Sequence, residues 1–215
     1  MKKFYDELIQ ETENERNVFL SIPILQAGAR GEISIKQYQD FLTQAYHHVK
    51  YTVPLLMACG SLLTDEYEWL REAVGEYIEE EMGHQEWILN DIAALGADKE
   101  LIRSGVPNLE TEFMVSYAWD TIHRKNPVGF FGMVLVLEGT SIALATQAAE
   151  AIKNKNNLPD GAFSYLNSHG SLDIEHIAFL ESLMNKLTSK KDKECVIHCA
   201  KAFYKLYGDI FRSIK

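Results

Sequence analysis

The stretch PVGFFGMVLVLEGTSIALATQAAEAIK, residues 127–153, predicts a long apolar helix that begins at Pro127. Proline is favoured in the first turn of a helix, because the N–H that it lacks would have no partner there. The most apolar part, VGFFGMVLVL (128–137), is too short to cross a membrane, which takes roughly 20 residues. The segment is therefore expected to be a helix inside a folded domain, and it carries a single acid, Glu138.

The remaining sequence has the same helical character. Glycine and proline are scarce and cluster at junctions, and no stretch alternates apolar and polar residues for long enough to make a strand. We expect an all-α fold, with residues 1–215 forming a single-domain bundle of about seven helices. The first expected helix covers residues 2–25, and Pro23 with the turn GARGE (28–32) marks its end. The second covers 33–63, with a capping box at Ser34 and Gln37 and a kink at Pro54, and the third covers 65–95, between Thr64 and Gly96. The remaining expected helices are 98–104, 108–126, 127–153 and, after a loop at 154–161, residues 162–170, 171–187 and 190–214.

Charge and cysteine content narrow the classes of function. The chain has 31 acidic and 21 basic residues and a formal net charge of −10. Nucleic acids and anionic membranes need clustered positive charge, so we expect neither as a partner. Three cysteines and a charged N-terminal segment without the apolar core of a signal peptide favour a reduced, cytoplasmic protein.

The stretch HGSLDIEH, residues 169–176, places polar groups on an apolar helix face. Residues three, four and seven apart share a face, so His169, Asp173 and His176 point the same way, in line with the apolar residues at 179–183. Burying two imidazoles and a carboxylate is costly unless they are paired or bind a metal. The face therefore predicts metal ligands, whereas Glu175 falls on the far side and should be solvated.

A second segment, EYIEEEMGHQEWIL (76–89), has the same spacing. Glu81 precedes His84 by three residues and Glu80 precedes it by four, and Asp91 continues the face. By itself an acid-x-x-His pair is weak evidence, because solvated helices often contain one. Two such pairs on different helices make a metal site more plausible than one.

Two further segments add donors. Glu138 is an unpaired acid inside an apolar helix, where the alternative to metal binding is a buried ion pair with an Arg or a Lys. QAYHHVKYT (44–52) adds His47 and His48, at least one of which is expected to be an ordinary core histidine. Paired acid-x-x-His motifs with single acids on other helices are the ligands of di-iron and di-manganese bundles, and such oxygen and nitrogen donors suit Fe(II) or Mn(II).

With these motifs the chain resembles the heme-oxygenase-like superfamily, the fold of TenA proteins and the PQQ-forming oxidase. The resemblance is most specific at EEEMGHQEWILNDIAALG (79–96), VLVLEGTSIALA (134–145) and HGSLDIEH, and it is greatest to the di-iron oxidases and oxygenases. It implies His84, Glu138, His169, Asp173 and His176 as metal ligands, with Glu81 as the sixth and with Glu80, His47 and His48 as further candidates. Tyr77 stands where some relatives have a glutamate.

Other branches of the superfamily fit less well. TenA-type hydrolases use an acid in the second helix, where this chain reads QAY (44–46), and a mid-chain cysteine, whereas none lies between Cys59 and Cys195. True heme oxygenases carry their haem-ligating histidine in the first helix, and here no histidine precedes His47.

The resemblance implies a non-haem di-iron enzyme with two Fe(II) per chain, Mn being the alternative metal, and O2 as co-substrate. Its substrate would be a small organic acid or amine, and hydroxylation, N-oxygenation, desaturation and C–C cleavage stay open. No catalytic residue beyond the ligands is implied, with Tyr77 and Tyr46 as candidates; a homodimer and an electron donor are expected partners. The alternatives are a metal-free TenA-like hydrolase or binder of a small heterocycle, such as a thiamine pyrimidine, and a non-catalytic helical interaction protein.

Overall fold

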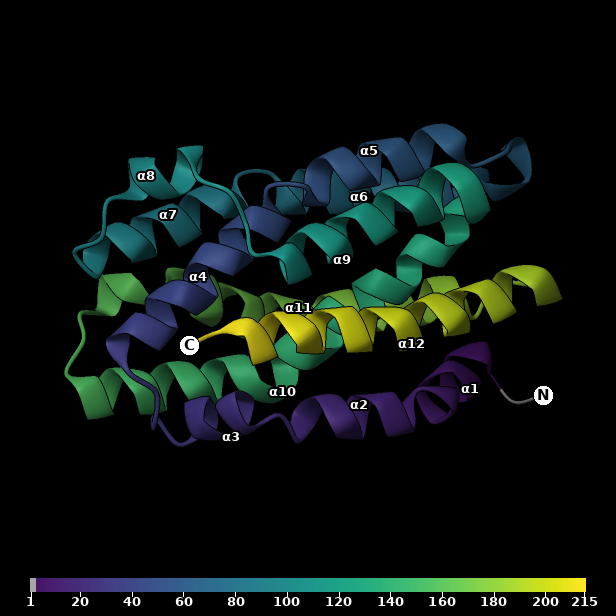
Figure 1. The fold of residues 1–215 in the computed structure, drawn as a ribbon. Coiled ribbons are helices and arrows are strands. Elements are labelled where there is room, and N and C mark those ends of the chain that lie inside the picture. The colour runs from purple at the N-terminus through teal and green to yellow at the C-terminus, as the bar shows by residue number, and fades with distance from the viewer. Residues whose placement is uncertain (1–2) are drawn as a thin grey trace.

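A computed structural model describes residues 3–215, except for the side chains of residues 143–144 and 169–174. Every regular element in this part of the chain is helical, which confirms the all-α prediction. Most of the long helices run along a common direction, whereas α4 crosses obliquely (Figure 1). Helices α1 to α3 lie along one edge and α5 and α6 along the opposite edge, and α12 lies in front of α10 and α11 (Figure 1). Across the described residues there are twelve α-helices rather than about seven, because several expected helices are broken.

The segment expected as one helix at 2–25 forms three: α1 (Phe4–Glu11), α2 (Glu13–Leu20) and α3 (Pro23–Ala29). The first break is at Thr12, which leaves helical geometry at φ −104° while its hydroxyl donates to the Leu8 carbonyl at 2.8 Å. Pro23 was expected to end a helix and instead begins one. Its fixed φ and missing N–H suit the first position of α3.

The expected helix at 33–63 divides into α4 (Ile35–Val49) and α5 (Thr52–Leu62). The capping box is confirmed: the Gln37 N–H donates to the Ser34 hydroxyl, and the Ser34 N–H donates to the Gln37 side chain. The predicted kink at Pro54 is wrong, because the break comes earlier, between Val49 and Thr52. Pro54 then lies in the first turn of α5, where a helix tolerates proline.

The expected helix at 65–95 breaks within its candidate metal motif. After a short 3-10 turn (η1, Asp65–Tyr67), α6 runs over Glu68–Glu81 and α7 over His84–Ala94. Gly83, between them, has a φ of +94°, a left-handed conformation that favours glycine. Glu81 therefore ends one helix and His84 begins the next. Gly96 ends α7 as expected, with a φ of +80°.

The C-terminal half forms the longest helices. The short helix expected at 98–104 is α8, and the single segment expected at 127–153 is mostly α10. The predicted division at 170–171 is wrong, since α11 runs through it; one glycine inside a helix costs only about 1 kcal/mol. The elements are α8 (Lys99–Ser104), α9 (Leu109–Asp120), the π-helical turn η2 (Thr121–Lys125), the 3-10 turn η3 (Pro127–Phe130), α10 (Phe131–Asn156), the 3-10 turn η4 (Asp160–Ala162), α11 (Ser164–Met184) and α12 (Lys190–Ser213).

Length and apolarity leave one candidate for a membrane span. No single helix among the described residues is long and apolar enough to cross a membrane. Two segments that meet at a bend of 45°, Pro127–Ile142 and Ala145–Asn156, pass the same test as a pair.

Helix α10 is the central element of the core. It packs against α3, α11 and α12, and its residues 131–136 are buried without interruption. A Cβ atom on Gly132 would lie 2.6 Å from the Ala200 nitrogen and 2.8 Å from the Val196 oxygen of α12. The two backbones therefore meet at Gly132, where no side chain fits.

This contact predicts that Gly132→Ala destabilises the protein, because the added methyl group meets backbone atoms that cannot rotate away. We expect a loss of about 1–3 kcal/mol in the free energy of unfolding, measured by urea denaturation. Gly75→Ala is the matched control, since Gly75 lies on the exposed side of α6 with open space around its Cβ position. That change should stabilise by roughly 0.5–1 kcal/mol, and equal effects of both substitutions would contradict the packing argument.

Candidate metal centre

A cavity of about 80 Å³ opens between α4, α5, α6, α10, α11 and α12. Acids and a histidine line one part of it, and apolar or aromatic side chains line the rest. The lining residues are His48, Val49, Thr52, Leu56, Tyr77, Glu81, Phe130, Met133, Val134, Leu137, Glu138, Ser141, Tyr165 and Tyr207. Three candidates from the sequence, His48, Glu81 and Glu138, thus meet at one place from three helices.

His47 and His48 are both buried in α4, but they face different surroundings. His48 lines the cavity and meets the Tyr207 ring of α12 edge-on, with centroids 5.8 Å apart. His47 instead has its Nδ1 3.3 Å from the Lys50 Nζ. Burial and that ammonium lower the pKa of His47 to about 4, so it is neutral near pH 7. Of the pair, His48 is the one that the fold brings to the candidate site.

Glu81 and His84 remain neighbours although a helix break separates them. The Glu81 Oε2 lies 3.0 Å from the His84 Nδ1, and both side chains are buried. Trp87, one turn along α7, stacks on the His84 ring with centroids 4.1 Å apart, which fixes the plane of the imidazole. The left-handed Gly83 turn, rather than a continuous helix face, makes this pairing.

His176 connects α11 to the acids of two other helices. Its Nε2 lies 2.9 Å from the Glu80 Oε2 of α6, and its Nδ1 lies 3.7 Å from the Glu138 Oε1 of α10. Glu138 is 8% exposed and lines the cavity, whereas the Glu80 side chain is half exposed. The Tyr77 ring packs against His176 at 6.0 Å and also lines the cavity. These contacts bring α6, α10 and α11 together around His176.

Of the remaining candidates, two have side chains outside the described residues and one lies away from the cavity. The side chains of His169 and Asp173 lie outside the described residues, so their predicted role as ligands stays a prediction. Within the described set, no three His, Cys, Asp or Glu side chains form a group that could hold a metal ion. Tyr46 is not brought to the cavity; it lies in the core near His47. Glu175 is exposed, as expected.

The cavity is rich in acid and poor in fixed positive charge. Glu81 and Glu138 are both at most 9% exposed, and no lysine or arginine occurs among the described residues that line the cavity. Burying a carboxylate costs several kcal/mol unless a cation or hydrogen bonds compensate. The alternative to metal binding, a buried ion pair of Glu138 with an Arg or a Lys, is therefore not found among these described lining residues. Carboxylate and imidazole donors of this kind match Fe(II) or Mn(II).

Asp91 has a structural role that the sequence did not reveal. It is fully buried on α7, and its carboxylate accepts from the Ser164 N–H at 3.0 Å, the Tyr165 N–H at 2.9 Å and the Ser164 hydroxyl. It therefore caps the N-terminus of α11, the helix that carries His176. A cap from a distant helix leaves no local motif, since 73 residues separate Asp91 from Ser164.

This cap predicts that Asp91→Ala loosens α11. The free energy of unfolding should fall by about 1–3 kcal/mol, because two backbone N–H groups lose their acceptor in the interior. Hydrogen exchange at the start of α11 should accelerate more than exchange in α9. Asp40→Ala is the control, since Asp40 forms a surface ion pair with Lys36 within one helix. Unchanged exchange in α11 after Asp91→Ala would contradict the assignment.

Comparisons with solved structures place this fold among known ones. A domain of unknown function with a heme oxygenase-like fold from Shewanella denitrificans OS217 is 20% identical, at a TM-score of 0.86 over 98% of this chain and 91% of its own. A TenA homologue from Pseudomonas syringae pv. tomato DC3000 is 11% identical, at a TM-score of 0.80 over 97% and 91%. Heme oxygenase-1 from the cyanobacterium Synechocystis sp. PCC6803, solved with heme, is 10% identical, at a TM-score of 0.78 over 100% and 93%.

These similarities establish a heme-oxygenase-like fold, as the sequence motifs predicted. Identities this low show the fold alone. No curated protein matches the chain in sequence. A protein family described as iron-containing redox enzyme matches residues 39–208, which extend from within α4 to within α12. The chain belongs to this family of iron-containing redox enzymes within the heme-oxygenase-like superfamily.

Proposed function

We propose that the chain is a non-haem iron oxidoreductase that uses O2 to oxidise a small organic acid or amine at the cavity around Glu81 and Glu138. The proposal assigns two Fe(II) ions per chain, with Mn(II) as the alternative metal. The proposed ligands are Glu81, His84, Glu138, His169, Asp173 and His176, with His48 and Glu80 as further candidates.

One observation carries this proposal: two buried glutamates, each next to a buried histidine, share a cavity whose described lining has no lysine or arginine. Metal cations would offset that negative charge. Membership of an iron-containing redox family supports iron as the metal. The contacts of His176 with Glu80 and Glu138 support a site shared between α6, α10 and α11.

The protein side chains would position the reactants and exclude water. Iron bound here would supply the electron-transfer chemistry and the open coordination positions that O2 and substrate need. Leu56, Phe130 and Met133 line the same cavity as the acids and would limit the access of bulk water to it. Trp87 holds the His84 ring in its plane. Tyr77, on the cavity wall beside His176, is the candidate to hold a substrate oxygen or to donate a proton through its hydroxyl.

Metal content tests the proposal directly. After anaerobic loading and removal of unbound metal, the chain should retain about two irons. His176→Ala should lose at least half of that iron, whereas His198→Ala should lose none, because His198 is exposed on α12. If the loaded protein keeps neither iron nor manganese, and His176→Ala behaves as the parent does, the proposal is wrong. A metal-free hydrolase or an interaction protein would then be favoured.

The two adjacent histidines of α4 give a sharper comparison. His48→Ala should weaken Fe(II) binding about 10- to 100-fold, the usual effect of removing a group that supports a metal site. His47→Ala should leave it unchanged, because His47 does not line the cavity. Both changes truncate a buried imidazole in one helix, so losses of packing are matched. Binding is measured by titration against a competing chelator, and equal affinities in the two variants would remove His48 from the site.

The expected homodimer, electron donor and cytoplasmic location stay predictions. The size of the purified protein in solution, measured by size-exclusion chromatography with light scattering, tests the homodimer.

A further inference from the structure

A second cavity, of about 100 Å³, lies beside the candidate metal centre and has a different character. Its walls come from α2, α3, α4, α10, α11 and α12, and none of its described lining side chains is ionisable near pH 7. The lining residues are Phe19, Ile24, Leu25, Gly28, Ile33, Gln37, Tyr38, Phe41, Thr140, Ser141, Ala145, Ala148, Ile152, Tyr165, Leu166, Tyr207, Phe211 and Ile214.

Several hydroxyl groups in this wall are already used inside the protein. The Tyr38 hydroxyl donates to the Ala162 carbonyl at 2.8 Å, and the Thr140 hydroxyl donates to the Val136 carbonyl at 2.7 Å. The Ser141 hydroxyl donates to the Glu138 carbonyl at 2.9 Å. These donors are therefore turned toward the backbone, and the cavity offers a ligand mainly hydrocarbon and aromatic surface.

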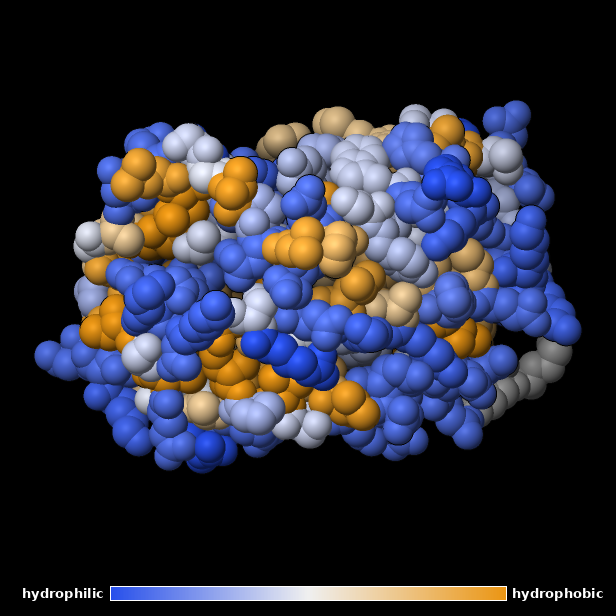
Figure 2. Space-filling model, viewed as in Figure 1, coloured by the Kyte–Doolittle hydropathy of each residue, from blue (hydrophilic) through white to orange (hydrophobic). Residues whose placement is uncertain are grey.

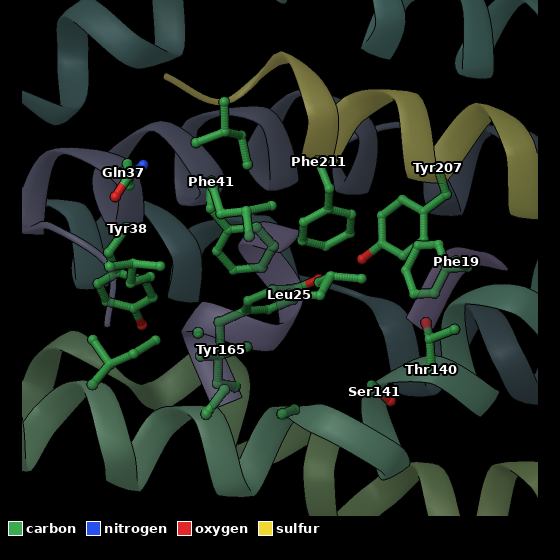
Figure 3. Close-up of a pocket in the computed structure, with 18 residues that line it drawn as sticks. Phe19, Leu25, Gln37, Tyr38, Phe41, Thr140, Ser141, Tyr165, Tyr207 and Phe211 are labelled. Carbon is green, nitrogen blue, oxygen red and sulfur yellow. The ribbon is translucent and has the colours of Figure 1, made fainter. Parts of the chain in front are cut away.

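The two cavities share three wall residues: Ser141, Tyr165 and Tyr207. In Figure 3 the side chains of Tyr165 and Tyr207 extend toward each other from opposite sides, and Phe41 and Phe211 lie on the same side as Tyr207. On the far side of this boundary stand Glu138, Glu81 and His48 of the candidate metal centre. The described lining thus changes from uncharged on one side of these shared residues to acid-containing on the other.

The apolar cavity also reaches toward the surface. Its residues Ile24 and Leu25 on α3, and Phe41 on α4, are half-buried rather than buried. Figure 2 shows apolar side chains gathered on this face between α12 and α3, the helices labelled in Figure 1. A ligand could enter from this side without passing the acids.

We propose that the apolar cavity holds the hydrocarbon part of an amphipathic substrate, whose polar, reacting end lies at the Ser141–Tyr165–Tyr207 boundary and faces Glu138. The identity of the reacting end rests on the proposed function, whereas binding of the apolar part does not. A dry apolar cavity of about 150 Å³ accepts benzene, so this smaller cavity of about 100 Å³ suits a short alkyl chain. The substrate class is therefore a small acid or amine with an uncharged apolar group.

The test is a series of primary alcohols, from 1-butanol to 1-octanol, titrated calorimetrically into metal-free and Fe(II)-loaded protein. Alcohols are neutral, so their binding does not depend on the charge of the acids. Each methylene that enters the cavity should raise the affinity roughly fourfold, until the cavity is full. The rise should stop within the series, because the cavity is small.

Substitutions that fill the apolar cavity with a larger side chain should block alcohol binding. Gly28 lines the cavity from α3, and a Cβ atom there has no neighbour within 4 Å, so Gly28→Leu places a side chain in open space. This change should lower the affinity for 1-hexanol and 1-octanol at least tenfold and leave the protein folded. Ala148→Leu is a second blocking variant from α10. Gly75→Leu is the matched control, because it is also a helical glycine with open space but lies outside the cavity.

The outcomes separate the two proposals. Affinity that does not change with chain length, or an equal loss in the Gly28→Leu and Gly75→Leu proteins, would overturn the apolar subsite. If iron is retained while the length dependence is absent, this inference fails and the metal proposal stands. If the length dependence is present in a protein that binds no iron, the subsite stands and the metal proposal fails.

Discussion

The burial of Glu138 on an apolar helix is the constraint that the surrounding structure has to satisfy. A carboxylate in the interior loses several kcal/mol of hydration, which only hydrogen bonds or nearby cations restore. Helix α10 cannot turn this residue to solvent, because the helix packs against α3, α11 and α12 and its backbone touches α12 at Gly132. Compensation must come from neighbouring helices, and His176 of α11 lies 3.7 Å away. The packing of α10 therefore keeps Glu138 buried, and side chains of the neighbouring helices have to stabilise its carboxylate.

A turn and a cap from a distant helix position the groups near this acid. The Gly83 turn ends α6 at Glu81 and starts α7 at His84, so that the pair meets across a bend. Asp91 then fixes the start of α11 by accepting two backbone N–H groups. Because α7 supplies both His84 and this cap, one helix sets the position of its own histidine and of the helix that carries His176. A shift of α7 would therefore move both His84 and the start of α11.

The interior separates functions by polarity. The cavity on one side of Ser141, Tyr165 and Tyr207 includes Glu81, Glu138 and His48 in its wall, whereas the described wall of the other cavity has no charged side chain. A hydrocarbon chain beside the acids would remove their hydrogen bonds to water without replacing them, which costs free energy. An apolar wall likewise offers no hydrogen-bond partner to a charged end of a ligand. A bound molecule with two such ends would have one favoured orientation. The tyrosines, with an apolar ring and a polar hydroxyl, suit the boundary between the two environments.

The sequence by itself determined the helical class, the capping box at Ser34 and the family motifs, because local periodicity and turn residues act over a few positions. It also singled out Glu81, His84, Glu138 and His176, since polar residues on apolar faces are costly. Only the tertiary structure decided the helix breaks near Thr12, Tyr51 and Gly83, and that His48 rather than His47 faces the cavity. Those choices depend on which helices pack against each face, and the Asp91 cap and the apolar cavity join segments far apart in the chain. Contacts between segments far apart in the chain produce no regular residue spacing, so the sequence alone does not reveal them.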